Sequence, residues 1–131
     1  MSEKVTIDLV THDPHSDEFV LYLVEDGPWP TRESEWKECL KGIQDRILAA
    51  ADAAIDGHLA QKYPDSVGKS IRIQVDSPNG CPDRVDNLVA AVKTFLNHDP
   101  SYISTIGASP HIRGLRVVTA KEMGRFDESK N

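Results

Sequence analysis

The chain has 131 residues, 39% of them hydrophobic and 27% charged, and its formal net charge is −6 at pH 7. This length predicts a single domain with a core of its own. The acidic balance and the lack of a Lys/Arg cluster argue against a nucleic-acid partner, and no apolar run approaches the ~18 residues needed to span a membrane. With no secretory signal at the start and only two cysteines, Cys39 and Cys81, we expect a cytoplasmic protein with reduced thiols.

The first two predicted elements are strands, because apolar and polar residues alternate in residues 4–10 and again in residues 19–25. In the first strand, Val5, Ile7 and Leu9 are expected to face the core. The segment between the strands is rich in Asp, Pro and Ser, which favour turns. Together these features predict a β-hairpin.

The connection between the two strands also carries side chains of the kind that bind metals. These candidate ligands are His12, Asp13, His15, Asp17 and Glu18. A zinc site needs ligands at fixed spacing on a rigid frame, whereas these residues surround a proline in a hairpin loop. We interpret the segment as a turn, and whether His12 and His15 bind a metal is left open.

A long helix is predicted over residues 32–62, with Thr31 as its cap. Its apolar residues recur at helical spacing from Trp36 to Leu59. Gly57 interrupts this pattern, and glycine costs about 1 kcal/mol relative to alanine inside a helix. A bend or a break is therefore expected at Gly57.

The second half of the chain predicts four further segments: a strand at 70–76, a helix that starts with Pro82, an irregular loop at 100–114 and a strand at 115–120. Residues 121–131 are expected to form a mobile polar tail. The predicted domain therefore covers residues 1–120.

The element order β-β-α-β-α-β indicates an α+β fold. Because each helix has one apolar face, we expect a two-layer sandwich, a mixed four-stranded sheet with both helices on one face. The two crossover connections should be right-handed and join parallel strands. The other sheet face should then be a polar platform. Its expected residues are Thr6, Asp8, Tyr22, Arg72, Gln74, Asp76 and Arg116.

A scattered pattern of single residues runs from the end of the second strand to the start of the third. It consists of an acid, a tryptophan, a glycine and a leucine at a helix end, a Tyr-Pro pair and a later glycine, which are here Asp26, Trp29, Gly57, Leu59, Tyr63, Pro64 and Gly68. In this pattern the chain resembles, over residues 4–118, a family of small bacterial proteins known only as a domain of unknown function. The hairpin turn and the loop at 100–114 are longer than in short family members. The resemblance implies a compact bacterial cytosolic domain and no catalytic role.

The chain contains residues that enzymes use, but they form no recognisable catalytic motif. It has no G-x-S-x-G sequence. Asp76, His98 and His111 could gather in the loops at the carboxyl ends of the parallel strands, which is the alternative interpretation as a small enzyme. His98 equally suits the end of a helix. We therefore assign no catalytic residue, no cofactor and no metal ligand.

The remaining interpretation is a protein that binds another protein and is not an enzyme. Trp29, held between two prolines, could anchor a partner or pack the helix start onto the core. An immunity-type inhibitor of a basic toxin fits the size and the negative charge. A homodimer through a sheet edge is left open. The expected partner-binding residues are Asp8, Tyr22, Trp29, Arg72, Gln74 and Asp76.

Overall fold

The structure is a computed structural model that describes residues 7–78 and 80–120. It confirms the predicted α+β class and the mixed four-stranded sheet. The elements are β1 (Leu9–Asp13), β2 (Glu18–Val24), α1 (Glu33–Asp56), α2 (His58–Lys62), the 3-10 helix η1 (Pro64–Ser66), β3 (Lys69–Asp76), α3 (Asp83–His98), α4 (Pro100–Ala108) and β4 (Ile112–Thr119). The predicted tail at 121–131 lies outside the described residues.

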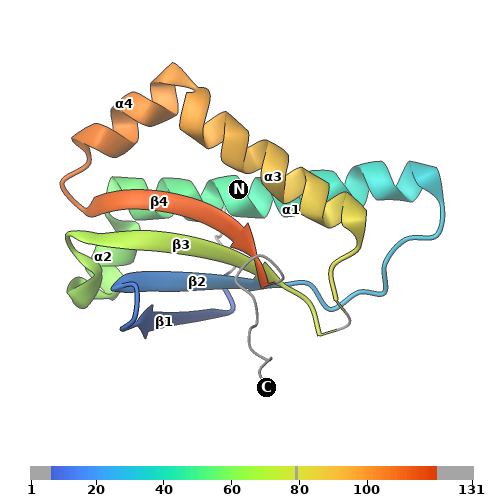
Figure 1. The fold of residues 1–131 in the computed structure, drawn as a ribbon, viewed down its shortest axis with the longest axis horizontal. Coiled ribbons are helices and arrows are strands. Elements are labelled where there is room, and N and C mark those ends of the chain that lie inside the picture. The colour runs from blue at the N-terminus through green and yellow to red at the C-terminus, as the bar shows by residue number, and fades with distance from the viewer. Residues whose placement is uncertain (1–6, 79, 121–131) are drawn as a thin grey trace.

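The four strands lie side by side in the order β1-β2-β3-β4 (Figure 1). β1 and β2 form the predicted antiparallel hairpin, with a turn at residues 14–17 in which Asp17 has a φ of 54°. β2 is parallel to β3, and β3 is parallel to β4, as the crossover connections require. In this register Arg72 lies beside Arg116.

One apolar core joins the helices to the strands. On the strands it contains alternate residues such as Leu21, Ile73 and Val117, which have no accessible surface. Burial of one such side chain contributes about 1.5–3 kcal/mol. Residues of α1 and α3 at helical spacing complete the same core, and Figure 1 shows both helices running alongside the strands. The helical members are Ile43, Ile47, Ala50, Ala51, Ala54, Ile55, Val85, Val89, Val92 and Leu96.

The predicted break in the long helix occurs at Gly57. This residue has a φ of 100°, a left-handed conformation that glycine adopts without strain, and it separates α1 from α2. A Cβ atom at this position would also lie 2.8 Å from Nε2 of His111, so the site needs glycine for close packing as well. The predicted cap at Thr31 is wrong, because Arg32 occupies the cap position and makes no side-chain cap bond.

Two local predictions in the rest of the chain are also wrong. The segment predicted as an irregular loop contains α4, whose first turn is capped by Asp99: its carboxylate accepts a hydrogen bond from the backbone N–H of Tyr102 at 3.1 Å. In the first strand, the chain bends at Asp8, so Leu9 is 54% exposed and Val10 packs against the core instead.

Candidate functional site

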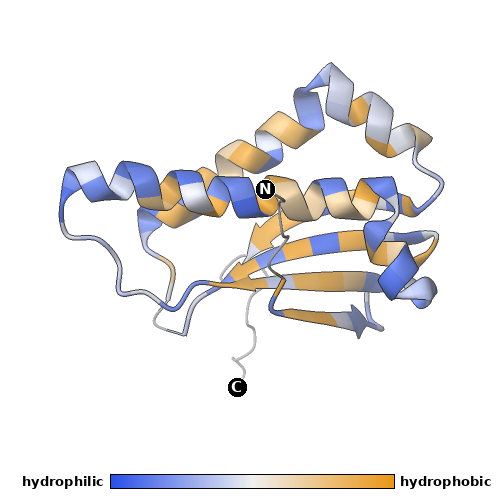
Figure 2. Cartoon of the chain, turned by 180° about the vertical axis from the view of Figure 1, so that it is seen from behind, coloured by the Kyte–Doolittle hydropathy of each residue, from blue (hydrophilic) through white to orange (hydrophobic). Residues whose placement is uncertain are grey.

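The strand side chains that point away from the core form a second surface, which we call the outer face. In Figure 2, hydrophilic stretches interrupt the apolar colour of the strands. Alternation places four of the predicted partner-binding residues on this face, and the register adds acids from the hairpin and a second arginine from β4. Its charged and polar members are Thr11, Asp13, Glu18, Tyr22, Ser70, Arg72, Gln74, Asp76 and Arg116.

Glu18, the first residue of β2, is the centre of a hydrogen-bond network on the outer face. Its carboxylate accepts from Nη1 of Arg72 at 2.9 Å, from Nε of Arg116 at 2.7 Å and from Nη2 of Arg116 at 2.9 Å. The hydroxyl of Ser16, in the hairpin turn, donates to it at 2.8 Å. One carboxylate thus ties three adjacent strands together, because β2, β3 and β4 each supply a member.

The network extends from Glu18 and Arg72 across to β1 and along β3. Nη1 of Arg72 also donates to Asp13 of β1 at 3.0 Å, and its Nε donates to Gln74 at 3.2 Å. Gln74 in turn donates to Asp76 at 3.1 Å. The side chains of Arg72 and Glu18 are only 6% and 8% exposed, whereas that of Arg116 is 44% exposed. The ion pairs are therefore buried at the centre of the sheet and open to solvent on the β4 side.

The charges in this network keep the carboxyl groups of Glu18 and Asp13 ionised. Burial on its own would raise the pKa of Glu18, but hydrogen bonds from Arg116 and Ser16, together with the charges of Arg116 and Arg72, hold that pKa below its usual value. Burial likewise opposes ionisation of Asp13, but the hydrogen bond and charge of Arg72, together with hydrogen bonds from the backbone of His15 and Ser16, lower the pKa of Asp13. Neither group is suited to accept a proton as a general base at neutral pH.

Asp8, predicted for the outer face, lies beside α1 instead. Its carboxylate accepts from the backbone N–H of Val24 at 2.7 Å and from Nη2 of Arg46, on α1, at 2.9 Å. Arg46 also pairs with Glu25 at 2.6 Å. The hydrogen bond from Val24 and the contact with Arg46 lower the pKa of Asp8 despite partial burial. This residue joins the edge of the hairpin to the helix.

Trp29 also lies away from the outer face. Its ring stacks on that of Trp36 in the first turn of α1, with a centroid separation of 6.1 Å and an interplanar angle of 7°. Arg84 of α3 lies 5.2 Å from the Trp36 ring and pairs with Glu33. The half-buried Trp29 therefore packs the loop before α1 against the start of that helix and the core, which fits the structural one of its two predicted roles.

The residues of the predicted enzyme site do not come together. Asp76 is the last residue of β3, whereas His111 precedes β4 and its carbonyl accepts from Gly68, just before β3 begins. These two residues are thus at opposite ends of parallel strands. His98 ends α3 and its Nδ1 lies 2.8 Å from the carbonyl oxygen of Thr94.

The predicted turn is shorter than expected: His15 lies in the turn at residues 14–17, whereas His12 and Asp13 belong to β1 and Glu18 to β2. Nε2 of His12 lies 2.8 Å from Asp17, and the backbone N–H of His15 donates to Asp13 at 3.0 Å. Asp17 also accepts from Lys69 at 3.0 Å. Over the described residues 7–78 and 80–120, no three His, Cys, Asp or Glu side chains are grouped so that they could hold a metal ion. In the same ranges, no helix has both the length and the apolar character that crossing a membrane requires.

Alternation in the sequence found Tyr22, Arg72, Gln74, Asp76 and Arg116 on the outer face, but it missed the central role of Glu18. The available signal was a carboxylate directly before an apolar strand, and nothing in the sequence paired it with two arginines. The resemblance to a bacterial family stays a prediction: no family model matches the chain, and neither a curated protein nor a solved structure matches it.

Proposed function

We propose that this protein is a non-enzymatic cytoplasmic binding protein that recognises another protein through its outer face. The proposal takes the domain as a two-layer sandwich, with both helices on one face of the sheet and the outer face left for the partner. The core that α1 and α3 share with the inward strand residues supports this packing.

The observation that carries the proposal is the Glu18–Arg72–Arg116 network. A buried ion pair is often no more stabilising than well-packed apolar residues of similar volume, so stability alone does not call for it on a sheet face. Such a network does hold arginine side chains in fixed positions, which lowers the entropy that binding costs. Arginine and tyrosine are also the residues that most often dominate binding energy at interfaces.

The form of the surface favours binding over catalysis. An enzyme needs a concave site on which titratable groups converge, whereas a binding surface can be flat. Two hollows lie along the C-terminal half of α1, and no residue of the outer face lines either of them. The carboxylates of the outer face are held in ion pairs or amide hydrogen bonds.

The partner class follows from charge. The net charge of −6 favours fast association with a basic protein, and an immunity-type inhibitor of a basic toxin domain is the proposed role. The described outer face holds three acids, Asp13, Glu18 and Asp76, and two arginines. The long-range attraction therefore comes from the whole chain, and the outer face supplies specific contacts.

The test is to recover the partner with the tagged full-length protein, with the two outer-face variants Leu9→Arg and Tyr22→Ala, and with one control variant. Leu9, on β1, pairs with Tyr22 across the hairpin and is 54% exposed. Ile103, on α4, is 52% exposed and serves as a control far from the outer face. We expect Leu9→Arg to lower recovery of the partner by about tenfold or more, while Ile103→Arg leaves recovery unchanged.

Three results would contradict the proposal. The first is that no protein is recovered with the unaltered chain at near-equal amounts. The second is that Leu9→Arg and Tyr22→Ala retain the partner, and the third is that Ile103→Arg loses it to the same extent. Equal thermal stability of the three variants and the parent chain shows that a loss of recovery comes from the altered surface.

A further inference from the structure

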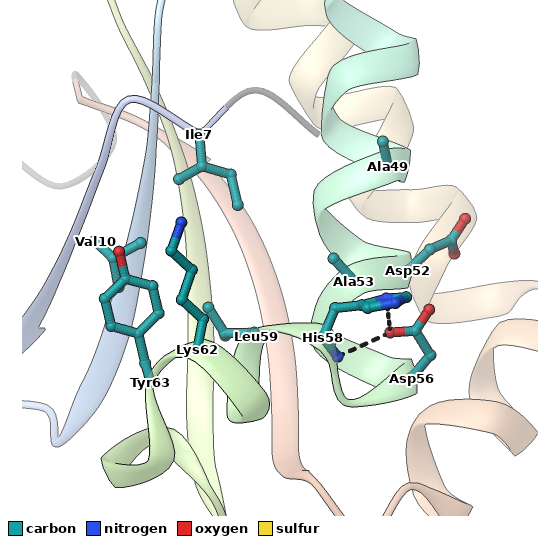
Figure 3. A pocket seen from close by; sticks show the side chains of 10 residues that line it. All are labelled: Ile7, Val10, Ala49, Asp52, Ala53, Asp56, His58, Leu59, Lys62 and Tyr63. Atoms are coloured by element: carbon teal, nitrogen blue, oxygen red, sulfur yellow. Dashed lines mark hydrogen bonds and ion pairs between the residues drawn. The ribbon is translucent and has the colours of Figure 1, made fainter. Parts of the chain in front are cut away.

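A groove on the opposite side of the hairpin from the outer face has no role in the proposed function. It lies between β1, the last turns of α1 and α2, and its volume is about 590 Å³ (Figure 3). Small-molecule sites have volumes of about 300–1,000 Å³ and mostly apolar walls. The apolar walls here come from Ile7, Val10, Ala49, Ala53 and Leu59.

The acidic side chains around this groove have partners among the described residues, whereas its lysine does not. On the α1 side, Asp56 pairs with His58 at 2.8 Å and Asp52 accepts a hydrogen bond from the hydroxyl of Tyr102 at 2.9 Å. On the sheet side, Figure 3 shows Lys62 extended next to Tyr63 with its amine toward Ile7. Within the described part of the chain, the side chain of Lys62 makes no hydrogen bond or ion pair.

We propose that this groove binds a small molecule with an apolar body and a single carboxylate. The apolar body lies between the hairpin and α1, and the carboxylate pairs with the ammonium group of Lys62. This inference is independent of the proposed protein partner, because the groove and the outer face share no residue.

The charge of the ligand follows from the same arrangement. Lys62 is the lining cation without a partner in the described residues, so it favours an anion. Asp52 and Asp56 line the facing wall and repel additional negative charge. A single carboxylate pairs with Lys62 and is repelled by the two acids less than a phosphate dianion would be. A ligand amine is disfavoured because Asp52 and Asp56 already have partners in Tyr102 and His58.

The probe is octanoate, added to the ¹⁵N-labelled full chain and followed by two-dimensional NMR. We expect saturable shifts of the backbone amides of Ala49, Leu59 and Lys62. Octan-1-ol and octylammonium carry the same apolar tail with no charge or the opposite charge. Because Lys62 is exposed to solvent, its pairing should favour octanoate over octan-1-ol by about two- to fivefold in Kd.

Two variants separate the apolar and the charged contributions. Lys62→Met keeps the apolar stem and should remove the preference for octanoate over octan-1-ol. Ala49→Leu fills the groove and should weaken both probes, while Lys37→Met, an exposed change elsewhere on α1, should weaken neither. The proposal is overturned if octanoate causes no saturable shifts at the groove, if octylammonium binds as tightly, or if Lys62→Met leaves the preference intact.

Discussion

The ion pairs of Glu18 make a quantitative test of the outer face. In Glu18→Gln the shape of the side chain is kept and its charge is lost. Removing one partner of a buried ion pair costs about 3–5 kcal/mol. Arg72, at 6% exposure, would keep its bond to Asp13, and Arg116, at 44% exposure, can turn to water. We therefore expect Glu18→Gln to lower the free energy of unfolding by about 2–4 kcal/mol.

Urea unfolding at pH 7, followed by the fluorescence of the stacked tryptophans, measures this loss. With a slope near 2 kcal/mol/M the midpoint should fall by about 1–2 M. The exposed control Glu35→Gln should change the free energy by less than about 0.5 kcal/mol. The double variant Glu18→Leu/Arg72→Leu should be more stable than Glu18→Gln, because it leaves no unpaired charge at the buried centre. The two charges that lose a partner, Asp13 and Arg116, are 24% and 44% exposed and can be hydrated.

Glu18→Gln should also change how stability depends on pH. The pKa of Glu18 is 4.5 when the chain is unfolded and lower when it is folded. Glu18 therefore contributes to the free energy of unfolding above about pH 4.5, and this contribution is lost as the pH falls through its pKa in the folded chain. Glu18→Gln should flatten this acid limb. A loss at pH 7 below about 1 kcal/mol, with an unchanged acid limb, would refute the reasoning about buried charge.

Three further predictions concern α2, α4 and their contacts. The pKa of Tyr102 is raised from 10.0 to about 12 by burial and by its hydrogen bond to Asp52. The folded chain thus keeps a proton that the unfolded chain loses, so stability should fall as the pH rises from 10 to 12, and Tyr102→Phe should flatten this decline in urea titrations. Gly57→Ala should cost about 1–3 kcal/mol in the same assay, because its positive φ and the nearby His111 both exclude a Cβ atom. Asp99→Ala should cost about 1 kcal/mol in thermal unfolding through loss of the α4 cap, and an unchanged melting temperature would show that the cap is dispensable.

The elements that the sequence predicted well are those with long apolar patterns. β2, β3, α1 and α3 each place several apolar residues at the spacing of their own secondary structure, so tertiary contacts and local pattern agree. The break at Gly57 was also predictable, because glycine there interrupts an otherwise continuous pattern. Strand order was not predictable, since pairing between strands depends on contacts that alternation does not encode.

α4 was missed because its pattern is weak. None of its residues is fully buried, and the segment contains β-branched residues, serine and glycine, which lower helix propensity. The overlooked signal was Asp99 followed by Pro100, a cap residue followed by the residue best suited to the first helical position. The first strand failed for a different reason: a bend at Asp8 shifts the alternation by one residue, and a run of seven residues cannot reveal such a shift.

The outer face has a buried centre and an exposed margin, and these two parts allow the proposed binding role to be tested separately from stability. Val20 and Val118 lie on this face, yet they are 0% and 1% exposed, so this part of the sheet is close-packed where Glu18 and Arg72 lie. In the proposed function, the paired polar groups at the centre would act by holding the exposed Arg116 in position, because Glu18 and Arg72 themselves are only 8% and 6% exposed. The proposed partner would then contact the exposed margin, which includes Leu9 and Arg116. Substitutions at the centre should therefore act on the free energy of unfolding, and substitutions at the margin should act on recovery of the partner.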